Sequence, residues 1–259
     1  MYKAVFFDID GTLQTLGLNQ ETYVPESNKR ALKELREKEV KIFIASGRPI
    51  NIIPEIEEKC EIQFDGYVMM NGQYVFNHEA MISKNTLPVD ELEKALLFLI
   101  ERQISVTVAE EDYVYQVEEI HHQTDQLYKN IASYKRIFEH PVYQIMPCIQ
   151  ESDVETEKEF FSILKSGQSA RWIDFFMDVI SKGSGKNTGI DKIIAYYGIS
   201  LDETMAFGDA GNDVGMLKHV NMGIAMGNGT PVAKEAAKYI TDPIDEEGIY
   251  NALKHFKVL

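Results

Sequence analysis

Short apolar runs alternate with longer amphipathic stretches in the first and last thirds of the chain. The apolar runs lack helical spacing and are typical of buried strands, whereas the amphipathic stretches have the spacing of helices with one apolar face. The predicted strands lie at 3–7, 40–45 and the start of 204–213, and the predicted helices at 27–39 and 186–198. Regular alternation of strands and helices predicts an open parallel sheet with helices on both faces, which is an α/β fold.

Turn and cap residues mark the ends of these elements. Ser27 is the expected N-cap of the first helix, and Pro49 is expected to start a helix whose body covers 50–60. The pair Asn71-Gly72 lies between two strand-like runs and predicts a hairpin. Near the C-terminus, Thr230 is the expected N-cap of a further helix. Gly198 is the expected C-terminal stop of the helix at 186–198.

The middle third has a different order of predicted strands and helices. Residues 89–103 predict one amphipathic helix, 104–117 predict two strands around an acidic turn, and 170–180 predict a strand. We interpret this part as an inserted α+β domain covering 83–181. The first and second parts of the core domain then cover 1–82 and 182–259.

Composition narrows the possible partners. The 259 residues are 44% hydrophobic and 26% charged, and the net charge of -15 argues against a nucleic-acid or anionic membrane surface as partner. The longest apolar run, residues 95–100, is too short to cross a bilayer, and no secretory signal pattern is visible. Cys60 and Cys148 form no CxxC motif. We therefore expect a cytoplasmic protein with reduced thiols.

Polar residues follow three of the predicted strands. Asp8 and Asp10 follow the first, Ser46 the second, and Asp209 and Asp213 the third. Because ligands bind beyond the carboxyl ends of strands in open α/β sheets, these side chains should meet in one crevice. Several carboxylates in one place require a cation, and oxygen ligands without His or Cys favour Mg²⁺ over zinc.

The same crevice is expected to bind a phosphate. Lys186 stands at the start of a predicted helix, where the helix N-terminus and an ammonium together attract an anion. Ser46 and the backbone N–H of Gly47 can donate to that phosphate. Lys182 competes with Lys186, although the helix start favours the latter. Arg48 is either a substrate-facing cation or a surface residue. This composition suits attack by an aspartate on a phosphoryl group.

Four motifs, "DIDGT", "IASGR", "GKNTG" and "GDAGND", resemble in order and spacing the four motifs of the haloacid dehalogenase superfamily of phosphatases. The insertion resembles the class IIB cap of Cof-like sugar-phosphate phosphatases. The resemblance covers essentially the whole chain. It implies a Rossmann-like core with an inserted α+β cap, and a cap that sets substrate specificity.

The resemblance also implies roles for individual residues. Asp8 would be the nucleophile that forms an aspartyl-phosphate, and Asp10 would protonate the leaving alcohol and then activate water. Ser46 would bind the phosphoryl group, and Lys186 would neutralise charge on it. Mg²⁺ would be held by Asp8, the backbone carbonyl of Asp10, and Asp209.

Further roles are implied for residues around these. Asp213 would orient Lys186 or a metal-bound water, and Thr12 would support the tight turn. Asn212 would contact the phosphate or support a residue that does. Gln14 stands where many members of the family carry an apolar residue, and we expect it to lie outside the chemistry.

The expected function is magnesium-dependent hydrolysis of small phosphorylated metabolites, sugar phosphates foremost. Two alternatives are a phosphotransferase or phosphomutase on the same scaffold, and a non-catalytic metabolite-binding regulator. His121-His122 is interpreted as exposed or packed within the cap rather than as a metal site, because adjacent side chains diverge. Residues 110–113 are interpreted as a solvated turn or, alternatively, as a loop that selects the substrate. The motifs leave the substrate and the oligomeric state open.

Overall fold

The computed structural model describes residues 1–16, 21–120 and 130–259. The chain divides into two compact units. Unit 1 contains residues 1–48, 52–83 and 185–259, and unit 2 contains residues 49–51 and 84–184. Within the part of the chain that the structure describes, no helix combines the length and the apolar character needed to cross a membrane.

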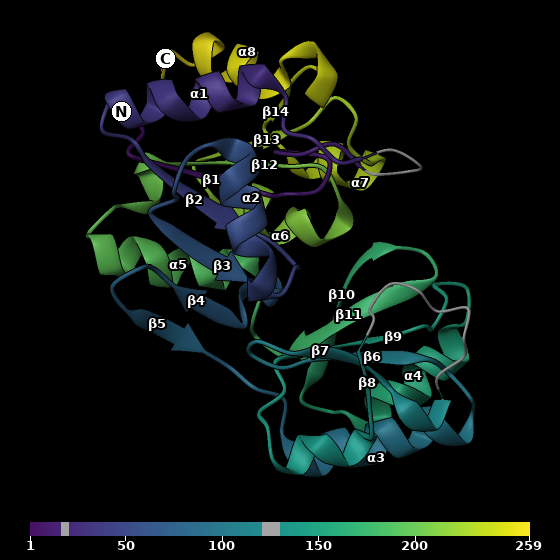
Figure 1. Ribbon diagram of the computed structural model, residues 1–259. Coiled ribbons are helices and arrows are strands. Elements are labelled where there is room, and N and C mark those ends of the chain that lie inside the picture. The colour runs from purple at the N-terminus through teal and green to yellow at the C-terminus, as the bar shows by residue number, and fades with distance from the viewer. Residues whose placement is uncertain (17–20, 121–129) are drawn as a thin grey trace. The chain divides into compact units, whose positions relative to one another are not determined.

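Unit 1 is built on an eight-stranded sheet in the order β14-β13-β12-β1-β2-β3-β4-β5 (Figure 1). The first strand, β1, lies at its centre and pairs in parallel with β12 and β2. Only the pairing of β3 with β4 is antiparallel among the pairings described. The strands are β1 (Ala4–Phe7), β2 (Lys41–Ala45), β3 (Gly66–Met69), β4 (Tyr74–Phe76), β5 (Met81–Lys84), β12 (Thr204–Gly208), β13 (Met222–Ala225) and β14 (Tyr239–Ile240).

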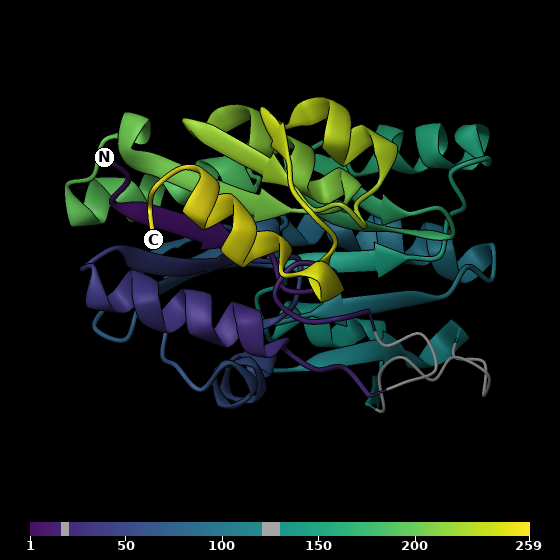
Figure 2. The same cartoon turned by 90° about the horizontal axis from the view of Figure 1, so that it is seen from above.

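Helices cover both faces of this sheet, which confirms the predicted α/β class (Figures 1 and 2). On one face α1 and α8 pack against each other, and on the opposite face α5 packs Ile190 and Ile193 against Phe6 and Phe43. Each fully buried side chain of this size contributes about 1.5–3 kcal/mol. The helices are α1 (Glu26–Glu37), α2 (Ile53–Cys60), α5 (Lys186–Tyr197), α6 (Val214–His219), α7 (Pro231–Ala236) and α8 (Gly248–His255).

One predicted helix start, at Ser27, is wrong; the other, at Pro49, is confirmed in part, because 50–60 is helical but its first turn is not α-helical. Helix α1 begins at Glu26, and its N-cap is Pro25 in an extended conformation, so Ser27 lies inside the helix and does not cap it. The segment after Pro49 first forms a 3₁₀ turn, and Pro54 is the proline in the first turn of α2. Proline favours a first helical turn in either place, so the pattern could not decide between them. The caps at Thr230 and Gly198 are confirmed.

The predicted hairpin between β3 and β4 is confirmed, but its turn is unusual. Met70, Asn71 and Gly72 all have positive φ, at 50°, 52° and 87°. Consecutive left-handed residues other than glycine are costly and persist only where the surroundings enforce them. At Gly72 a Cβ would lie 2.1 Å from the carbonyl oxygen of Gly185, so this turn packs directly against the start of α5.

Unit 2 has a six-stranded sheet in the order β10-β11-β9-β6-β7-β8, with α3 and α4 packed on one apolar core beside it (Figure 1). The predicted helix at 89–103 is confirmed as α3. The single strand predicted at 170–180 is wrong, because this segment belongs to an antiparallel pair, β10 and β11. The elements are α3 (Val89–Glu101), β6 (Val106–Ala109), β7 (Val114–Val117), β8 (Ile131–Ala132), β9 (Gln144–Pro147), α4 (Val154–Ile163), β10 (Gly167–Ile173) and β11 (Phe176–Ser181).

Candidate active site

The carboxyl ends of β1 and β12 bring buried carboxylates together in unit 1. The two strands pair in register, with Phe7 opposite Phe207, so Asp8 and Asp209 follow neighbouring strands. Asp213 stands four residues further on. One oxygen of each of these three carboxylates lies within 4.8 Å of the others, and all three residues are buried. We call Asp8, Asp209 and Asp213 the carboxylate cluster.

One ammonium group lies inside the carboxylate cluster. Lys186, the first residue of α5, is 2% exposed, and its Nζ donates to Oδ1 of Asp8 and to Oδ1 of Asp213, both at 2.6 Å. The second oxygen of Asp213 accepts from the backbone N–H groups of Asp209 and Ala210. Asp213 therefore ties Lys186 to the loop after β12. Lys182 is exposed and belongs to unit 2, so Lys186 is the lysine that the fold pairs with Asp8.

Burial, together with repulsion between neighbouring carboxylates, raises the pKa values of two acids of the carboxylate cluster. Burial raises the pKa of Asp8 to about 7, helped by repulsion from Asp213 and opposed by the Lys186 ammonium. Burial and the charge of Asp8 raise the pKa of Asp209 to about 8. Burial alone would lower the pKa of Lys186, but attraction to Asp213 and Asp8 outweighs it and raises that pKa. Three carboxylates share one ammonium, so the unbalanced charge calls for a further cation.

The donor set fits a hard divalent cation. Asp8 and Asp209 each engage one oxygen with a side-chain donor, Lys186 and Thr12 respectively, and each has a second oxygen to offer. Gly11 has a φ of 78°, and a Cβ there would lie 2.5 Å from Oδ2 of Asp209, so glycine keeps the space beside that oxygen free of a side chain. The cluster consists of carboxylates alone, which suits Mg²⁺ better than zinc.

Asp10 is held by two side-chain donors. The Arg48 guanidinium donates from Nε to Oδ2 at 2.8 Å and from Nη2 to Oδ1 at 3.0 Å. Gln14 donates from Nε2 to Oδ1 at 3.0 Å. Arg48 therefore turns toward the predicted acid, although its side chain is 43% exposed. The expectation that Gln14 lies outside the chemistry stays a prediction; the structure shows that the turn after Asp10 folds its buried amide back onto the carboxylate.

The predicted phosphate-binding residues are linked through a residue that the sequence assigned only to a turn. The N–H of Asn71 donates to the carbonyl of Ser46 at 2.9 Å, and Nδ2 of Asn212 donates to Oδ1 of Asn71 at 3.2 Å. The Oγ of Ser46 accepts from the N–H of Arg48, so Gly47 lies inside a short turn at the end of β2. Asn71 comes shortly after β3, which pairs in parallel with β2, so it lies at the same carboxyl edge of the sheet as Ser46. Its position after a predicted strand is the sequence signal that could have identified Asn71 as part of the site.

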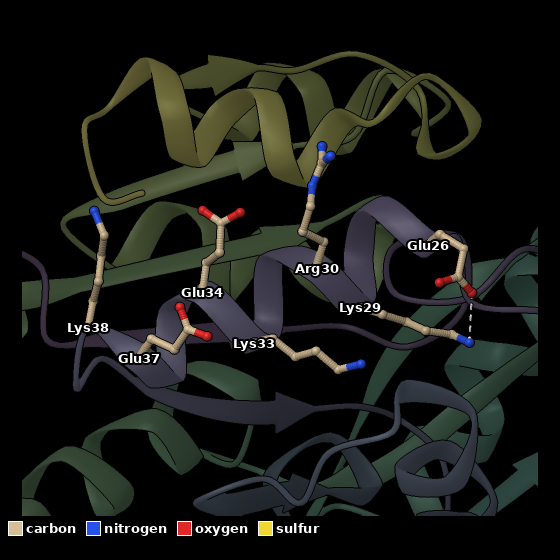
Figure 3. A pocket seen from close by; sticks show the side chains of 7 residues that line it. All are labelled: Glu26, Lys29, Arg30, Lys33, Glu34, Glu37 and Lys38. Carbon is tan, nitrogen blue, oxygen red and sulfur yellow. Dashed lines mark ion pairs between the residues drawn. The ribbon is translucent and has the colours of Figure 1, made fainter.

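A surface depression of about 490 Å³ lies elsewhere on unit 1, along α1 (Figure 3). Seven charged side chains of both signs line it, and Glu26 and Lys29 form an ion pair across one turn at 2.9 Å. Charges spaced three or four residues apart on an open helix face stabilise the helix modestly and need no ligand. We therefore assign no site to this depression. Its lining residues are Glu26, Lys29, Arg30, Lys33, Glu34, Glu37 and Lys38.

The acidic stretch 110–113 in unit 2 is a turn in which Glu111 and Asp112 are exposed, as expected, whereas Glu110 is buried. Glu110 is 3% exposed, and its two oxygens accept from Nε and Nη2 of Arg136, both at 2.8 Å. The guanidinium also lies 4.7 Å from the ring centre of Tyr113. The partner of Glu110 is 26 residues away, so no local pattern could reveal it. His121-His122 lies outside the described residues.

Comparison with known proteins identifies the family of the chain. Residues 5–253 match the model of the haloacid dehalogenase-like hydrolases. The Bacillus subtilis (strain 168) protein named "Putative phosphatase YkrA" is 31% identical over 272 residues, which cover 99% of this chain and 98% of YkrA. From the same strain, the 5-amino-6-(5-phospho-D-ribitylamino)uracil phosphatase YcsE is 23% identical over 98% of this chain and 95% of its own.

A solved structure supports the same assignment. The sugar phosphatase BT4131, described as a member of subclass IIB of this superfamily, superposes with a TM-score of 0.86 at 38% identity. The match covers 99% of this chain and 100% of BT4131. Sequence and fold thus agree over nearly the full length. The chain belongs to the haloacid dehalogenase-like hydrolases and is a Cof-like phosphatase of that superfamily.

Proposed function

We propose that this phosphatase hydrolyses small phosphorylated metabolites, sugar phosphates foremost, through an aspartyl-phosphate on Asp8 and with Mg²⁺. The observation that carries the proposal is the buried carboxylate cluster with its single ammonium. A carboxylate that must attack a phosphoryl group has to be ionised despite its burial, and Lys186 supplies the nearest positive charge.

In the proposed reaction Asp8 attacks phosphorus while the bond to the leaving alcohol breaks. Asp10 gives its proton to the leaving oxygen, and then takes a proton from the water that attacks the phosphorus of the aspartyl-phosphate. This second attack releases inorganic phosphate and restores Asp8. Lys186 stays charged throughout and balances the negative charge on Asp8 and the phosphoryl group.

Asp8 and Asp209, with the backbone carbonyl of Asp10, would hold the metal. When bound, Mg²⁺ supplies positive charge for the phosphoryl oxygens and favours the ionised form of the buried carboxylates. Asp213 would not bind it directly, because both its oxygens already accept hydrogen bonds from Lys186 and from the loop after β12. Its proposed role is to orient Lys186.

Ser46, Gly47 and Asn212 are proposed to bind the phosphate, and Arg48 the substrate. Ser46 directly follows β2, Asn212 lies in the 3₁₀ turn after β12, and both hydrogen-bond to Asn71, so a phosphate would meet donors held by one network. A sugar phosphatase and a ribityl-phosphate phosphatase among the relatives favour phosphate esters of sugars or polyols. Unit 2 is proposed to act as the cap domain that sets specificity. A cytoplasmic location stays a prediction.

The test is the release of inorganic phosphate from a panel of sugar, polyol and nucleoside phosphates, measured with Mg²⁺ and with EDTA. We expect hydrolysis that needs Mg²⁺ and falls by about 10³-fold or more in Asp8→Asn. The exposed Asp202→Asn is the matched control and should retain activity. Full activity in Asp8→Asn would refute the nucleophile. Phosphorus NMR of the products separates hydrolysis from transfer, since an isomerised sugar phosphate would show a mutase instead.

A further inference from the structure

Among the described residues, two side chains donate hydrogen bonds to Asp10, and Gln14 is the buried one of the two. Gln14 is 3% exposed and Arg48 is 43% exposed at its side chain, although both donate to the same carboxylate. An exposed arginine can exchange its partner for a substrate or for water. A buried amide has no such exchange available without leaving a polar group unpaired.

The backbone of Gln14 is tied to the same turn as Asp10. Its carbonyl accepts from the N–H of Gly11 at 2.8 Å, and its own N–H donates to the carbonyl of Ile9 at 2.9 Å. These bonds fix both neighbours of Asp10 relative to Gln14. The amide of Gln14 is therefore held in place before it reaches the carboxylate, and little conformational freedom is lost in making the contact.

We propose that Gln14 is a positioning residue for Asp10: it holds Oδ1, and Oδ2, which accepts from the exposed Arg48 in this structure, transfers the proton once Arg48 turns to the substrate. The proposal rests on the proposed function of Asp10. In the first step the O–H bond at Oδ2 breaks as the leaving oxygen gains the proton, and in the second step Oδ2 takes a proton from water. Oδ1 carries no proton in either state, so the Nε2–H of Gln14 can donate to it throughout the cycle.

This role predicts a loss that depends on the leaving group. Phenyl phosphate has a poor leaving group that needs the proton, whereas 4-nitrophenyl phosphate releases a stable anion that does not. For kcat/KM, which reports the first phosphoryl transfer, Gln14→Met should lose about tenfold on phenyl phosphate and less than about threefold on 4-nitrophenyl phosphate. Gln14→Glu, which keeps the shape but places a second carboxylate beside Asp10, should lose at least as much on phenyl phosphate.

A second readout separates positioning from a structural defect. Release of phosphate from Asp8 needs Asp10 as a base whatever the leaving group was. On 4-nitrophenyl phosphate, kcat and KM of Gln14→Met should therefore fall together while kcat/KM is nearly kept. Thr204→Val is the matched control, because it also removes a buried hydrogen-bonding group from unit 1, but from the start of β12, at the opposite end of the strand from Asp209. This control should lower kcat/KM equally on both substrates or on neither.

The reference variant is Asp10→Asn. Its kcat/KM should fall about 100-fold on phenyl phosphate and much less on 4-nitrophenyl phosphate. Equal losses on both substrates in Gln14→Met, or no loss on either, would overturn the role of Gln14 while Asp10→Asn keeps its selective loss. If Gln14→Met fails to fold by circular dichroism, Gln14→Glu carries the same comparison. If Asp10→Asn itself shows no selective loss, the proposed role of Asp10 fails, and that of Gln14 with it.

Discussion

Both units bury carboxylates, and they treat the buried charge differently. In unit 2, Glu110 meets Arg136 in a pair whose charges and donors match one to one. In unit 1, oxygens of Asp8, Asp209 and Asp213 lie within 4.8 Å of one another, and the Lys186 ammonium pairs with two of the three, Asp8 and Asp213. In a matched pair the buried negative charge is neutralised by a residue of the fold. In an unmatched cluster the excess negative charge destabilises the fold until a further cation binds. Unbalanced buried charge, rather than buried charge as such, therefore marks the proposed catalytic centre.

The largest effect is expected from removing Lys186, the one cation among the described residues that forms ion pairs with the carboxylate cluster. Lys186→Met leaves the three buried carboxylates without the ammonium that pairs with Asp8 and Asp213, so it should lower the free energy of unfolding by about 3–5 kcal/mol at neutral pH. It should also lower kcat by about 100-fold or more, because the phosphoryl group loses a counter-charge. Urea denaturation and phosphate release measure the two effects.

The control for this variant lies on the same helix. Lys192→Met makes the same substitution at an exposed position of α5 and should change stability by less than about 1 kcal/mol. Equal stability losses in the two variants would mean that Lys186 does not balance the carboxylate cluster.

A smaller effect is expected from pH in the metal-free protein. The raised pKa values of Asp8 and Asp209, about 7 and about 8, mean that the folded state binds more protons than the unfolded state between about pH 4 and pH 8. Stability should therefore fall as pH rises through this window. We expect the midpoint of thermal unfolding to drop by about 5–10 °C in EDTA.

Mg²⁺ should reverse this trend, because it binds the ionised carboxylates and stabilises most at high pH. Asp209→Asn should flatten the metal-free profile, while the exposed Asp202→Asn should leave it unchanged. A metal-free stability that rises with pH would contradict the assignment of unbalanced charge.

The smallest effect is expected from the matched pair of unit 2. Glu110→Gln should lower the free energy of unfolding by about 1–2 kcal/mol, since the amide keeps one acceptor for the Arg136 guanidinium. Glu159→Gln is the control, because its exposed pair with Arg102 should contribute less than about 1 kcal/mol. Neither change should depend on Mg²⁺. If the loss of stability in Glu110→Gln depended on Mg²⁺, the buried carboxylates of the two units would not differ in their need for a cation.

The sequence could predict the strand ends of unit 1 because its strands are apolar and their polar residues follow directly. It could predict that Asp8 and Asp209 meet, since neighbouring parallel strands end at one edge. It could not predict contacts made across turns of unusual backbone. Asn71 lies among three left-handed residues, and Gln14 reaches Asp10 only because the motif loop folds back.

In unit 2 as well, the sequence predicts local structure but not long-range contacts. The amphipathic pattern predicted α3 well, because a helix with one apolar face buries that face against the core. The burial of Glu110 depends on Arg136, which lies far along the chain, and a charged stretch without visible partners is naturally interpreted as exposed. Whether such a residue is buried depends on its long-range partner rather than on local propensity.

The most direct test of the account asks whether Asp8 becomes phosphorylated during turnover. The enzyme is mixed with 4-nitrophenyl phosphate and Mg²⁺, quenched in acid within milliseconds and reduced with borohydride, which converts an aspartyl-phosphate to homoserine. Peptide mass spectrometry should find homoserine at position 8, and none in Asp8→Asn or in EDTA. Homoserine at another acidic residue, or phosphate release with position 8 unmodified throughout, would contradict the account.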